Sequence, residues 1–304
     1  YNNKEFLDEI TKKGKRIYFR NEICFYSGLN QDCTELLDSL STDILSIVIE
    51  YMDLVDDLND VQIMTEFKMD KEQFITDIQK NRPTQEELDI ASDQSNHYQE
   101  KSPTEISKSE IKENDAEDFY SLLQMYGSII KNAELLDNNY KIEHLECYIY
   151  GMNMLYAMMI KLFDYMKKEI KFDKLSDSDK KHIKIETEEE FEKMKEQLVD
   201  VTKLIFPIAI QNLILETVGT PKLEAAINEL IKNKQDKPFE KFMLTFLKCD
   251  LKIVGLKNLL GKYIRDEKSK NILKIALMKL TFYYRSRFFG TDLQVDRELT
   301  DLIA

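Results

Sequence analysis

A chain of 304 residues is long enough for one large domain or two ordinary ones with a sizeable buried core. Hydrophobic residues make up 43% and charged residues 33%, but 8 Gly and 5 Pro are too few turn formers for an all-β protein of many short strands. The net charge of -13 disfavours general polyanion binding, and four scattered cysteines rule out a disulfide framework: Cys24, Cys33, Cys147 and Cys249.

The first predicted elements lie within residues 3–80. Residues 3–13 are compatible with a short helix, and the aromatic, β-prone segment from Lys15 to Tyr26 allows a minor β-hairpin around residues 20–22. A strong amphipathic helix is predicted from Asp32 to Val61, and a second helix follows to Lys80. The apolar face of the first of these helices is formed by Leu37, Leu40, Ile44, Ile47, Tyr51, Leu54, Leu58 and Val61.

A polar segment from Ile90 to Pro103 separates these helices from the rest of the chain. It is poor in large apolar residues, and capping boxes flank it, Thr84 with Glu87 and Ser102 with Glu105. We therefore predict an N-terminal acidic helical region over residues 1–89, a linker or loop over residues 90–103, and a main helical domain over residues 104–304.

The segment from Asn139 to Lys171 is predicted to be the central helix of the fold. Its apolar residues repeat at spacings of three and four, and further apolar residues cover the other faces near its middle. Such a helix is buried by neighbours on several sides. Its five methionines favour flexible filling of the core over a binding groove: Met152, Met154, Met158, Met159 and Met166.

The C-terminal half contains clear helix signals. Thr187 and Glu190 form a capping box that opens a helix to Glu216, with a kink expected at Pro207. Gly219-Thr220-Pro221 stops this helix and starts the next, and later helices are expected over residues 221–233, 238–248, 251–266, 268–289 and 292–303. The predicted fold is all-α: an irregular multi-helix bundle around a central buried helix, with at most the minor β-hairpin near the N-terminus.

Charge is unevenly distributed along the chain. Residues 31–120 contain 24 acidic and 7 basic residues, whereas residues 240–290 contain 4 acidic and 12 basic residues. The two regions have opposite signs, so they either pair with each other inside the fold or offer two surfaces to partners.

Residues 53–60 read DLVDDLND. The segment DDLND resembles the DDxxD motif of isoprenoid diphosphate and terpene synthases, and the resemblance implies that Asp56, Asp57 and Asp60 bind a Mg²⁺ cluster that holds a diphosphate. On a helix, the aspartates of residues 53–60 span an arc of about 100°, centred roughly 130° from the apolar face. That geometry suits a solvated surface, and a Mg²⁺-dependent all-α enzyme is kept as an alternative.

Basic and aromatic residues are interleaved near the C-terminus, where residues 282–289 read FYYRSRFF. Arginine with neighbouring aromatics is typical of single-stranded nucleic-acid binding. A helical-wheel projection of this segment predicts a buried stripe with basic residues on both sides of it; the stripe consists of Leu273, Leu277, Leu280 and Tyr284. We select Lys279, Arg285 and Arg287 as candidate partner-binding residues, and nucleic-acid binding through residues 240–290 is a further alternative.

Histidine and cysteine suggest one further candidate. His144 and Cys147 lie three residues apart on the central helix, close enough to share a ligand, but no paired Cys or His motif completes a zinc site. We expect a buried thiol beside a surface or capped imidazole, and a Cys–His nucleophilic pair stays open. Glycine-rich phosphate loops are absent from the sequence.

The sequence therefore favours a non-catalytic helical interaction or regulatory domain with a protein partner. No catalytic residue, metal ligand or cofactor is predicted. The apolar stretch from Tyr148 to Ile160 is too short to span a bilayer, so no membrane insertion is expected. The four scattered cysteines are typical of reduced thiols, which favours a cytoplasmic or otherwise intracellular location. The start YNNKEFLDEI has no initiator Met and no signal peptide, which is consistent with a fragment of a larger multidomain protein.

Overall fold

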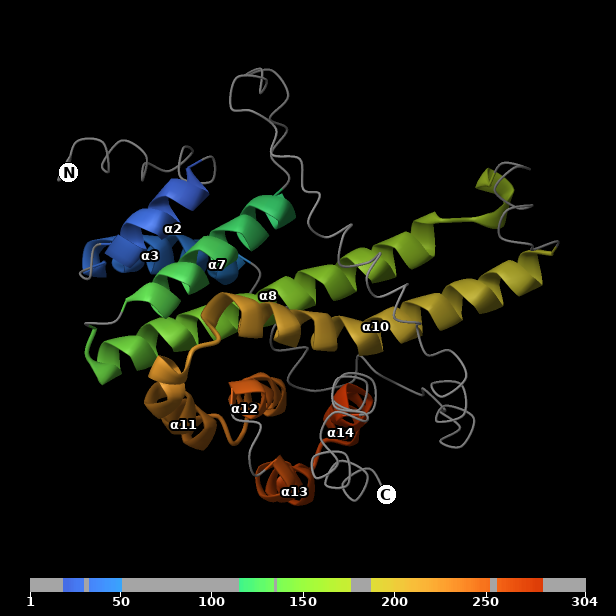
Figure 1. Cartoon of the computed structure of the whole chain (residues 1–304). Helices are drawn as coiled ribbons and strands as arrows, with labels where there is room; N and C mark the ends of the chain where they lie inside the picture. The colour runs from blue at the N-terminus through green and yellow to red at the C-terminus, as the bar shows by residue number, and fades with distance from the viewer. Residues whose placement is uncertain are drawn as a thin grey trace, which may run out of the picture. The chain divides into compact units, whose positions relative to one another are not determined.

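The computed structural model describes residues 19–29, 33–50, 115–133, 136–175, 187–251 and 256–280 (Figure 1). Of these residues 89% are helical and none lies in a strand, which confirms the predicted all-α class. The chain divides into two compact units, residues 1–65 with 115–304 and residues 66–114. Every described residue belongs to the first unit, and the predicted linker over residues 90–103 lies outside the described residues.

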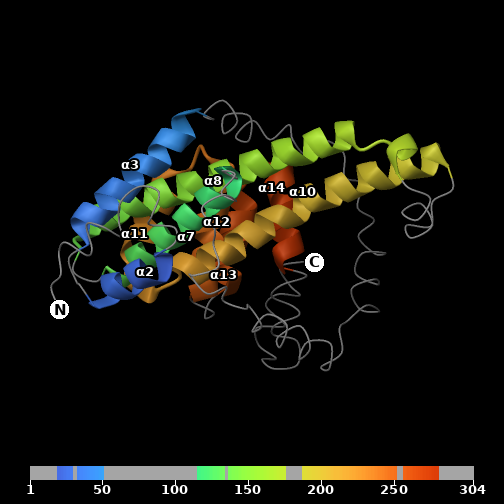
Figure 2. The same cartoon turned by 90° about the horizontal axis from the view of Figure 1, so that it is seen from above.

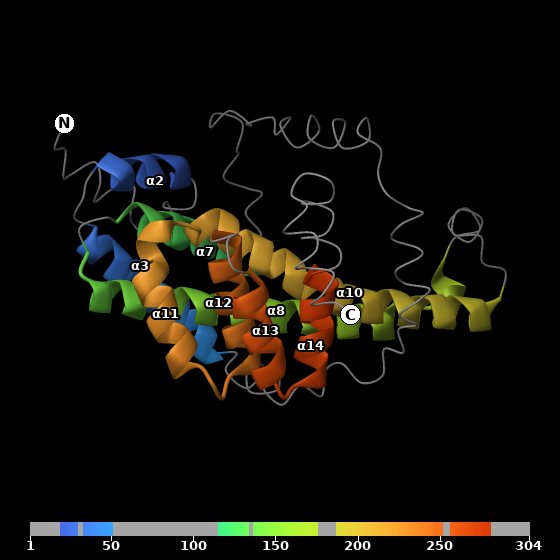
Figure 3. The same cartoon turned by 60° about the horizontal axis from the view of Figure 1, so that its bottom comes forward.

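The helices of this unit form an irregular bundle. Two long helices, α8 and α10, run side by side in Figures 1 and 2, and Figure 3 shows the C-terminal helices gathered in front of them. In chain order the described elements are α2 (Arg20–Leu29), α3 (Thr34–Glu50), α7 (Asp115–Asn132), α8 (Asn138–Glu169), the 3₁₀ turn η2 (Phe172–Lys174), α10 (Glu188–Val218), the 3₁₀ turn η3 (Pro221–Leu223), α11 (Glu224–Asn233), α12 (Pro238–Leu251), α13 (Leu256–Asp266) and α14 (Lys270–Met278).

Helix α8 is the centre of the unit, as the sequence predicts. It contacts α3, α7, α10, α11 and α12, and every residue from Gly151 to Ala157 is buried. Met152 and Met154 are fully buried, which confirms that these two methionines fill the core. The middle of α8 is therefore covered on all sides, and the helices that contact it are arranged around this stretch.

Two glycines allow α7, α8 and α10 to approach closely. A Cβ atom on Gly127 of α7 would lie 2.6 Å from Cγ2 of Thr217 and 2.7 Å from Cε2 of Tyr148. A Cβ atom on Gly151 of α8 would lie 2.5 Å from Cδ2 of Leu123. Real Cβ atoms do not come so near to other carbons, so a larger residue at either position would force the helices apart.

Helix α10 continues through Pro207, where the backbone loses one helical hydrogen bond. Proline has no N–H group, so it cannot donate to the carbonyl of Lys203 four residues earlier. The hydroxyl of Tyr156 on α8 donates to that carbonyl at 3.1 Å. A side chain of the central helix thus satisfies the acceptor that Pro207 leaves, and the contact ties α10 to α8.

The predicted capping groups are present at both ends of α10. Thr187 and Glu190 form a reciprocal capping box, which confirms the predicted helix start. Gly219 ends the helix, and a Cβ atom there would lie 2.0 Å from the Leu215 carbonyl oxygen. Thr220 then caps η3 by accepting a hydrogen bond from the Lys222 N–H.

The N-terminal segment differs from the prediction, because Arg20 to Leu29 form α2 and not part of a β-hairpin. Ile23 and Ser27, four residues apart, are both buried, and α2 packs against α7. The Arg20 guanidinium donates to Gln124 at 2.6 Å, and the Asn132 amide donates to the Cys24 carbonyl at 3.4 Å. Packing against α7 therefore outweighs the local β-propensity of these aromatic residues.

Helix α11 is joined to α8 and α12 by a buried lysine. The ammonium of Lys234 lies 2.5 Å from Glu146 of α8 and 3.0 Å from the fully buried carboxylate of Glu240 on α12. Burial alone would lower the pKa of Lys234, but the two carboxylates outweigh it and raise the pKa. The charged form is therefore the stable one, and it fixes α11 and α12 against the central helix.

Helix α10 is also the one described helix long and apolar enough to cross a membrane by length and composition. Of its most apolar stretch, 31% is buried inside the unit. Core helices of soluble proteins share this composition, so the property alone does not distinguish the two. The absence of membrane insertion stays a prediction.

Replacing Gly127 tests the close approach of α7, α8 and α10. We expect Gly127→Ala to lower the free energy of unfolding by about 1–3 kcal/mol, because the new methyl group overlaps Thr217 and Tyr148. The matched control is Gly28→Ala on α2, where the nearest heavy atom to the new Cβ lies 3.7 Å away. Urea unfolding should show no loss, or a gain of up to about 1 kcal/mol, for the control. Equal losses for both variants would contradict the proposed packing.

Candidate functional site

A pocket lies between α11, α12 and α13, and each helix contributes residues spaced along one face. Residues separated by three, four and seven positions lie on the same side of an α-helix, and each set follows this spacing. The lining residues are Asn228, Ile231, Lys232 and Gln235 from α11 and the turn after it, Lys241, Thr245 and Lys248 from α12, and Leu259, Lys262, Tyr263 and Asp266 from α13.

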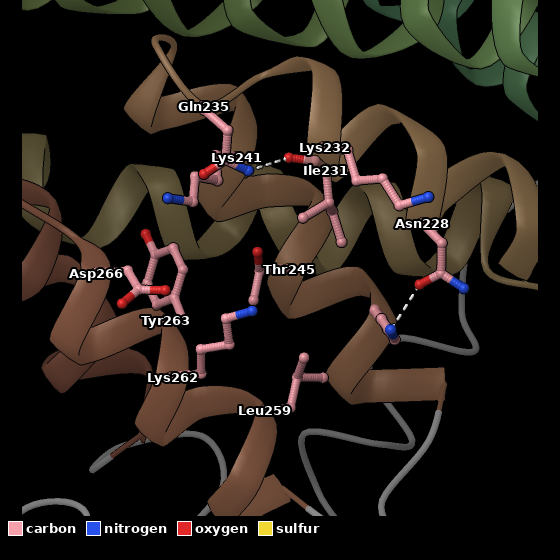
Figure 4. A pocket seen from close by; sticks show the side chains of 11 residues that line it. Asn228, Ile231, Lys232, Gln235, Lys241, Thr245, Leu259, Lys262, Tyr263 and Asp266 are labelled. Atoms are coloured by element: carbon pink, nitrogen blue, oxygen red, sulfur yellow. Dashed lines mark hydrogen bonds between the residues drawn. The ribbon is translucent and has the colours of Figure 1, made fainter.

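The pocket has a volume of about 590 Å³ and a strongly basic lining. Four lysines line it against a single carboxylate, that of Asp266. Figure 4 shows Lys262 and Thr245 directed into the space between the helices, with Ile231 and Leu259 as apolar parts of the wall. We call this site the lysine pocket.

Lys241 is the most buried lysine of the lysine pocket, with 7% of its surface exposed. Its ammonium lies 5.8 Å from the centre of the Tyr263 ring and 4.0 Å from the Glu267 carboxylate. The second distance is well beyond the about 2.7–2.9 Å of a charge-assisted hydrogen bond. The positive charge is therefore held inside the protein, and the carboxylate that lies nearest among the described residues is not hydrogen-bonded to it.

The other three lysines differ in their partners. Lys248 donates to the neutral amide oxygen of Asn228 at 2.5 Å, so its charge is not balanced by that contact. Lys232 pairs with Glu229 at 3.1 Å on an exposed surface, where such a pair contributes little. Lys262 is exposed and has no carboxylate partner among the residues that the structure describes. The lysine pocket therefore keeps a positive potential.

Tyr263 forms part of the wall and is 4% exposed. Its ring packs edge-on against Phe246, with centroids 6.0 Å apart. Its hydroxyl is buried and has no hydrogen-bond partner within the described part of the chain. Burial raises the pKa of Tyr263, and the nearby Glu267 and Cys249 raise it further. The hydroxyl thus stays protonated and is a hydrogen-bond donor without an acceptor.

Lys279, one of the candidate partner-binding residues, lies in the core and not on the surface. It is 0% exposed, and its ammonium lies 3.2 Å from Asp250 of α12 and 3.0 Å from the Asn212 amide oxygen of α10. Gln211 also donates to Asp250, at 2.9 Å. Of the predicted buried stripe, Leu280 is buried, whereas Leu273 and Leu277 are only half-buried. On α14 the buried residues include Ile272, Ile275 and Ala276.

Several other predicted features lie outside the described residues. These are the candidate residues Arg285 and Arg287, and the aspartates of the DDLND segment, Asp56, Asp57 and Asp60. The partner-binding role of the two arginines and the synthase-like metal site stay predictions. Within the described ranges, no group of three or more His, Cys, Asp or Glu side chains is placed to hold a metal ion.

The burial of His144 and Cys147 differs from the prediction of a buried thiol beside a surface or capped imidazole. The imidazole of His144 is buried, and the thiol of Cys147 is half-buried. The Tyr126 hydroxyl lies 2.6 Å from Nδ1 of His144, and Nε2 lies 3.6 Å from Asp38 of α3. Burial raises the pKa of Cys147 to about 11, although its hydrogen bond to Tyr126 opposes this. A thiol with this pKa is not a thiolate near neutral pH, and Tyr126 occupies the imidazole nitrogen, so the contacts favour a structural role over a nucleophilic pair.

Sequence reasoning recognised the basic region of residues 240–290 but missed the lysine pocket, which this region forms together with residues of α11 and the turn after it. The detectable signal was the spacing of Lys241, Thr245 and Lys248 on one helix and of Leu259, Lys262 and Asp266 on the next. That spacing shows which residues share a helix face. It does not show that three such faces meet, which depends on how the helices pack.

No protein-family model matches the sequence, and no match was found among the curated proteins or the solved structures.

Replacing Lys279 tests its structural role. We expect Lys279→Met to lower the free energy of unfolding by about 3–5 kcal/mol, because Asp250 would remain buried without its cation. The double variant Lys279→Met/Asp250→Leu should recover most of this loss, since it removes both charges. The exposed control Lys168→Met should stay within about 0.5 kcal/mol of the unmodified protein. An unchanged unfolding midpoint for Lys279→Met would contradict the buried pair.

The buried imidazole predicts a pH effect on stability. Burial lowers the pKa of His144 below its ordinary value of 6.5, although Asp38 and Glu143 oppose this. As the pH falls through 6.5, the unfolded chain therefore takes up a proton that the folded chain does not, and stability decreases. We expect the loss of unfolding free energy between about pH 7.5 and pH 5.5 to be smaller in His144→Gln than in the unmodified protein. Identical pH profiles in urea unfolding would show that His144 does not contribute.

Proposed function

We propose that this chain is a non-catalytic helical interaction domain that binds an acidic segment of a protein partner at the lysine pocket. One observation carries the proposal: four lysines and one aspartate line a concave site between three packed helices. Positive charges of this kind are otherwise dispersed over a surface or paired with carboxylates. In the lysine pocket, Lys248 donates to the amide of Asn228, and neither Lys248 nor Lys262 has a carboxylate partner among the described residues.

The lining residues of the site and the net charge of the chain favour a protein segment over a nucleic acid. Binding of single strands relies on a basic track with aromatic rings on which bases stack. Tyr263 is the one aromatic residue of the lining, and its ring is buried against Phe246. The net charge of -13 also repels a long polyanion, whereas a short acidic segment can enter the basic pocket.

The buried ion pairs that hold the surrounding helices together support a binding role. Lys234 fixes α11 and α12 to α8, and Lys279 with Asp250 joins α14 to α12. A preformed site loses less entropy when a ligand binds than a site that must be ordered. The contacts of His144 and Cys147, which do not favour a nucleophile, are consistent with a non-catalytic domain.

Binding of a short peptide rich in Asp and Glu tests this proposal. We expect the peptide to bind at low salt, measured by fluorescence anisotropy, and more weakly as salt is added. The double variant Lys248→Gln/Lys262→Gln should weaken binding by about tenfold or more, a change of about 1.4 kcal/mol. The matched control is Lys161→Gln/Lys168→Gln, which also removes two charges, from exposed positions on α8, and should leave the affinity unchanged.

Two results would overturn the proposal. Absence of peptide binding at low salt would remove it, and so would equal weakening by the pocket and control variants. Tighter binding of a single-stranded oligonucleotide that is lost in the same pocket variant would favour the nucleic-acid alternative instead. Circular dichroism of each variant checks that the helices remain folded.

A further inference from the structure

We infer that the anionic group recognised in the lysine pocket is a phosphate monoester, carried by a side chain of the partner or by a small molecule. This inference rests on the proposed function and specifies its ligand. It depends on three features of the site: the excess of positive charge, the presence of neutral donors beside it, and the room left for the group that carries the phosphate.

The charge of the lining suits a dianion better than a carboxylate. Lys241, Lys248 and Lys262 approach the pocket from two helices, and among the described residues none of them has a carboxylate in a direct hydrogen bond. A carboxylate carries one negative charge, whereas a phosphate monoester carries about 1.5 to 2 near pH 7. Lysines are compact point charges that can contact a tetrahedral group from several directions.

Neutral donors stand beside these lysines. The Thr245 side chain lies at the centre of the lining in Figure 4, close to Lys262 in that view. Tyr263 contributes a buried hydroxyl that has no acceptor among the described residues. A phosphate offers three strong acceptor oxygens, so it can use both hydroxyls together with the ammonium groups.

The Tyr263 hydroxyl gives the inference a distinct signature. In the free protein a buried donor without an acceptor is destabilising. Removing it in Tyr263→Phe should therefore keep or increase stability and at the same time weaken phosphate binding. A residue with a purely structural role would not produce this combination.

The remaining walls provide room for the carrier of the phosphate. The volume of about 590 Å³ exceeds the size of a phosphate group, and Ile231 and Leu259 supply apolar surface next to the lysines. Asp266 is the one carboxylate of the lining and repels an anion. Its removal in Asp266→Asn should therefore strengthen binding, in the opposite direction to the lysine variants.

Isothermal titration of the purified chain with four probes tests the inference at constant ionic strength. The probes are a phosphoserine peptide, the same peptide with unmodified serine, the same peptide with glutamate, and inorganic phosphate. We expect the phosphoserine peptide to bind about tenfold more tightly than the glutamate peptide, with no measurable binding of the serine peptide. Lys262→Gln and Tyr263→Phe should each weaken the phosphoserine peptide, Asp266→Asn should strengthen it, and Lys168→Gln should have no effect. Thermal unfolding of Tyr263→Phe should show an equal or higher midpoint.

The outcomes separate this inference from the proposed function. Inorganic phosphate that binds as tightly as the phosphoserine peptide would support the phosphate site with a small-molecule source. Equal affinity for the glutamate and phosphoserine peptides would overturn the inference and leave the acidic-segment proposal intact. Absence of binding by all four probes and by acidic peptides would overturn both. Unchanged affinity in Tyr263→Phe would remove the assigned role of its hydroxyl.

Discussion

The burial of the middle of α8 on all of its faces is the constraint on which the rest of the described structure depends. Residues 151–157 are covered completely, so helices must approach α8 from every side. Close approach in turn requires Gly127 and Gly151 where α7, α8 and α10 meet. The hydroxyl of Tyr156 then supplies the hydrogen bond that Pro207 cannot donate, which lets α10 run past the middle of α8 without an unsatisfied carbonyl at that point.

Buried charges connect this core to the candidate site. Lys234 pairs with Glu146 of α8 and Glu240 of α12, and Lys279 pairs with Asp250 while contacting Asn212 of α10. Removing one partner of such a pair would leave a buried charge uncompensated, which is strongly destabilising. These ion pairs hold α11, α12 and α14 in position. Other residues of α11 and α12 line the lysine pocket together with residues of α13.

The lysines of the last quarter of the chain therefore divide into two kinds with different roles. Lys279 is enclosed and neutralised by Asp250, so it belongs to the core. Lys241, Lys248 and Lys262 line an open site whose own carboxylate is that of Asp266. The charge of Lys279 is used within the fold, because it compensates a buried carboxylate. Lysines that have no close carboxylate among the described residues can instead bind an anionic ligand. The proposals for an acidic segment and for a phosphate both depend on this difference.

The sequence alone determined the helical class, the central helix and the caps at Thr187 and Thr220, because these follow from apolar spacing and from local hydrogen bonds. Only the tertiary structure decided that residues 20–26 are helical, since their burial against α7 is a long-range contact. It also decided that Lys279 is buried while Lys262 is not. Spacing along one helix orders its side chains around the axis, but the identity of the facing helix determines which of those sides meets protein and which meets solvent.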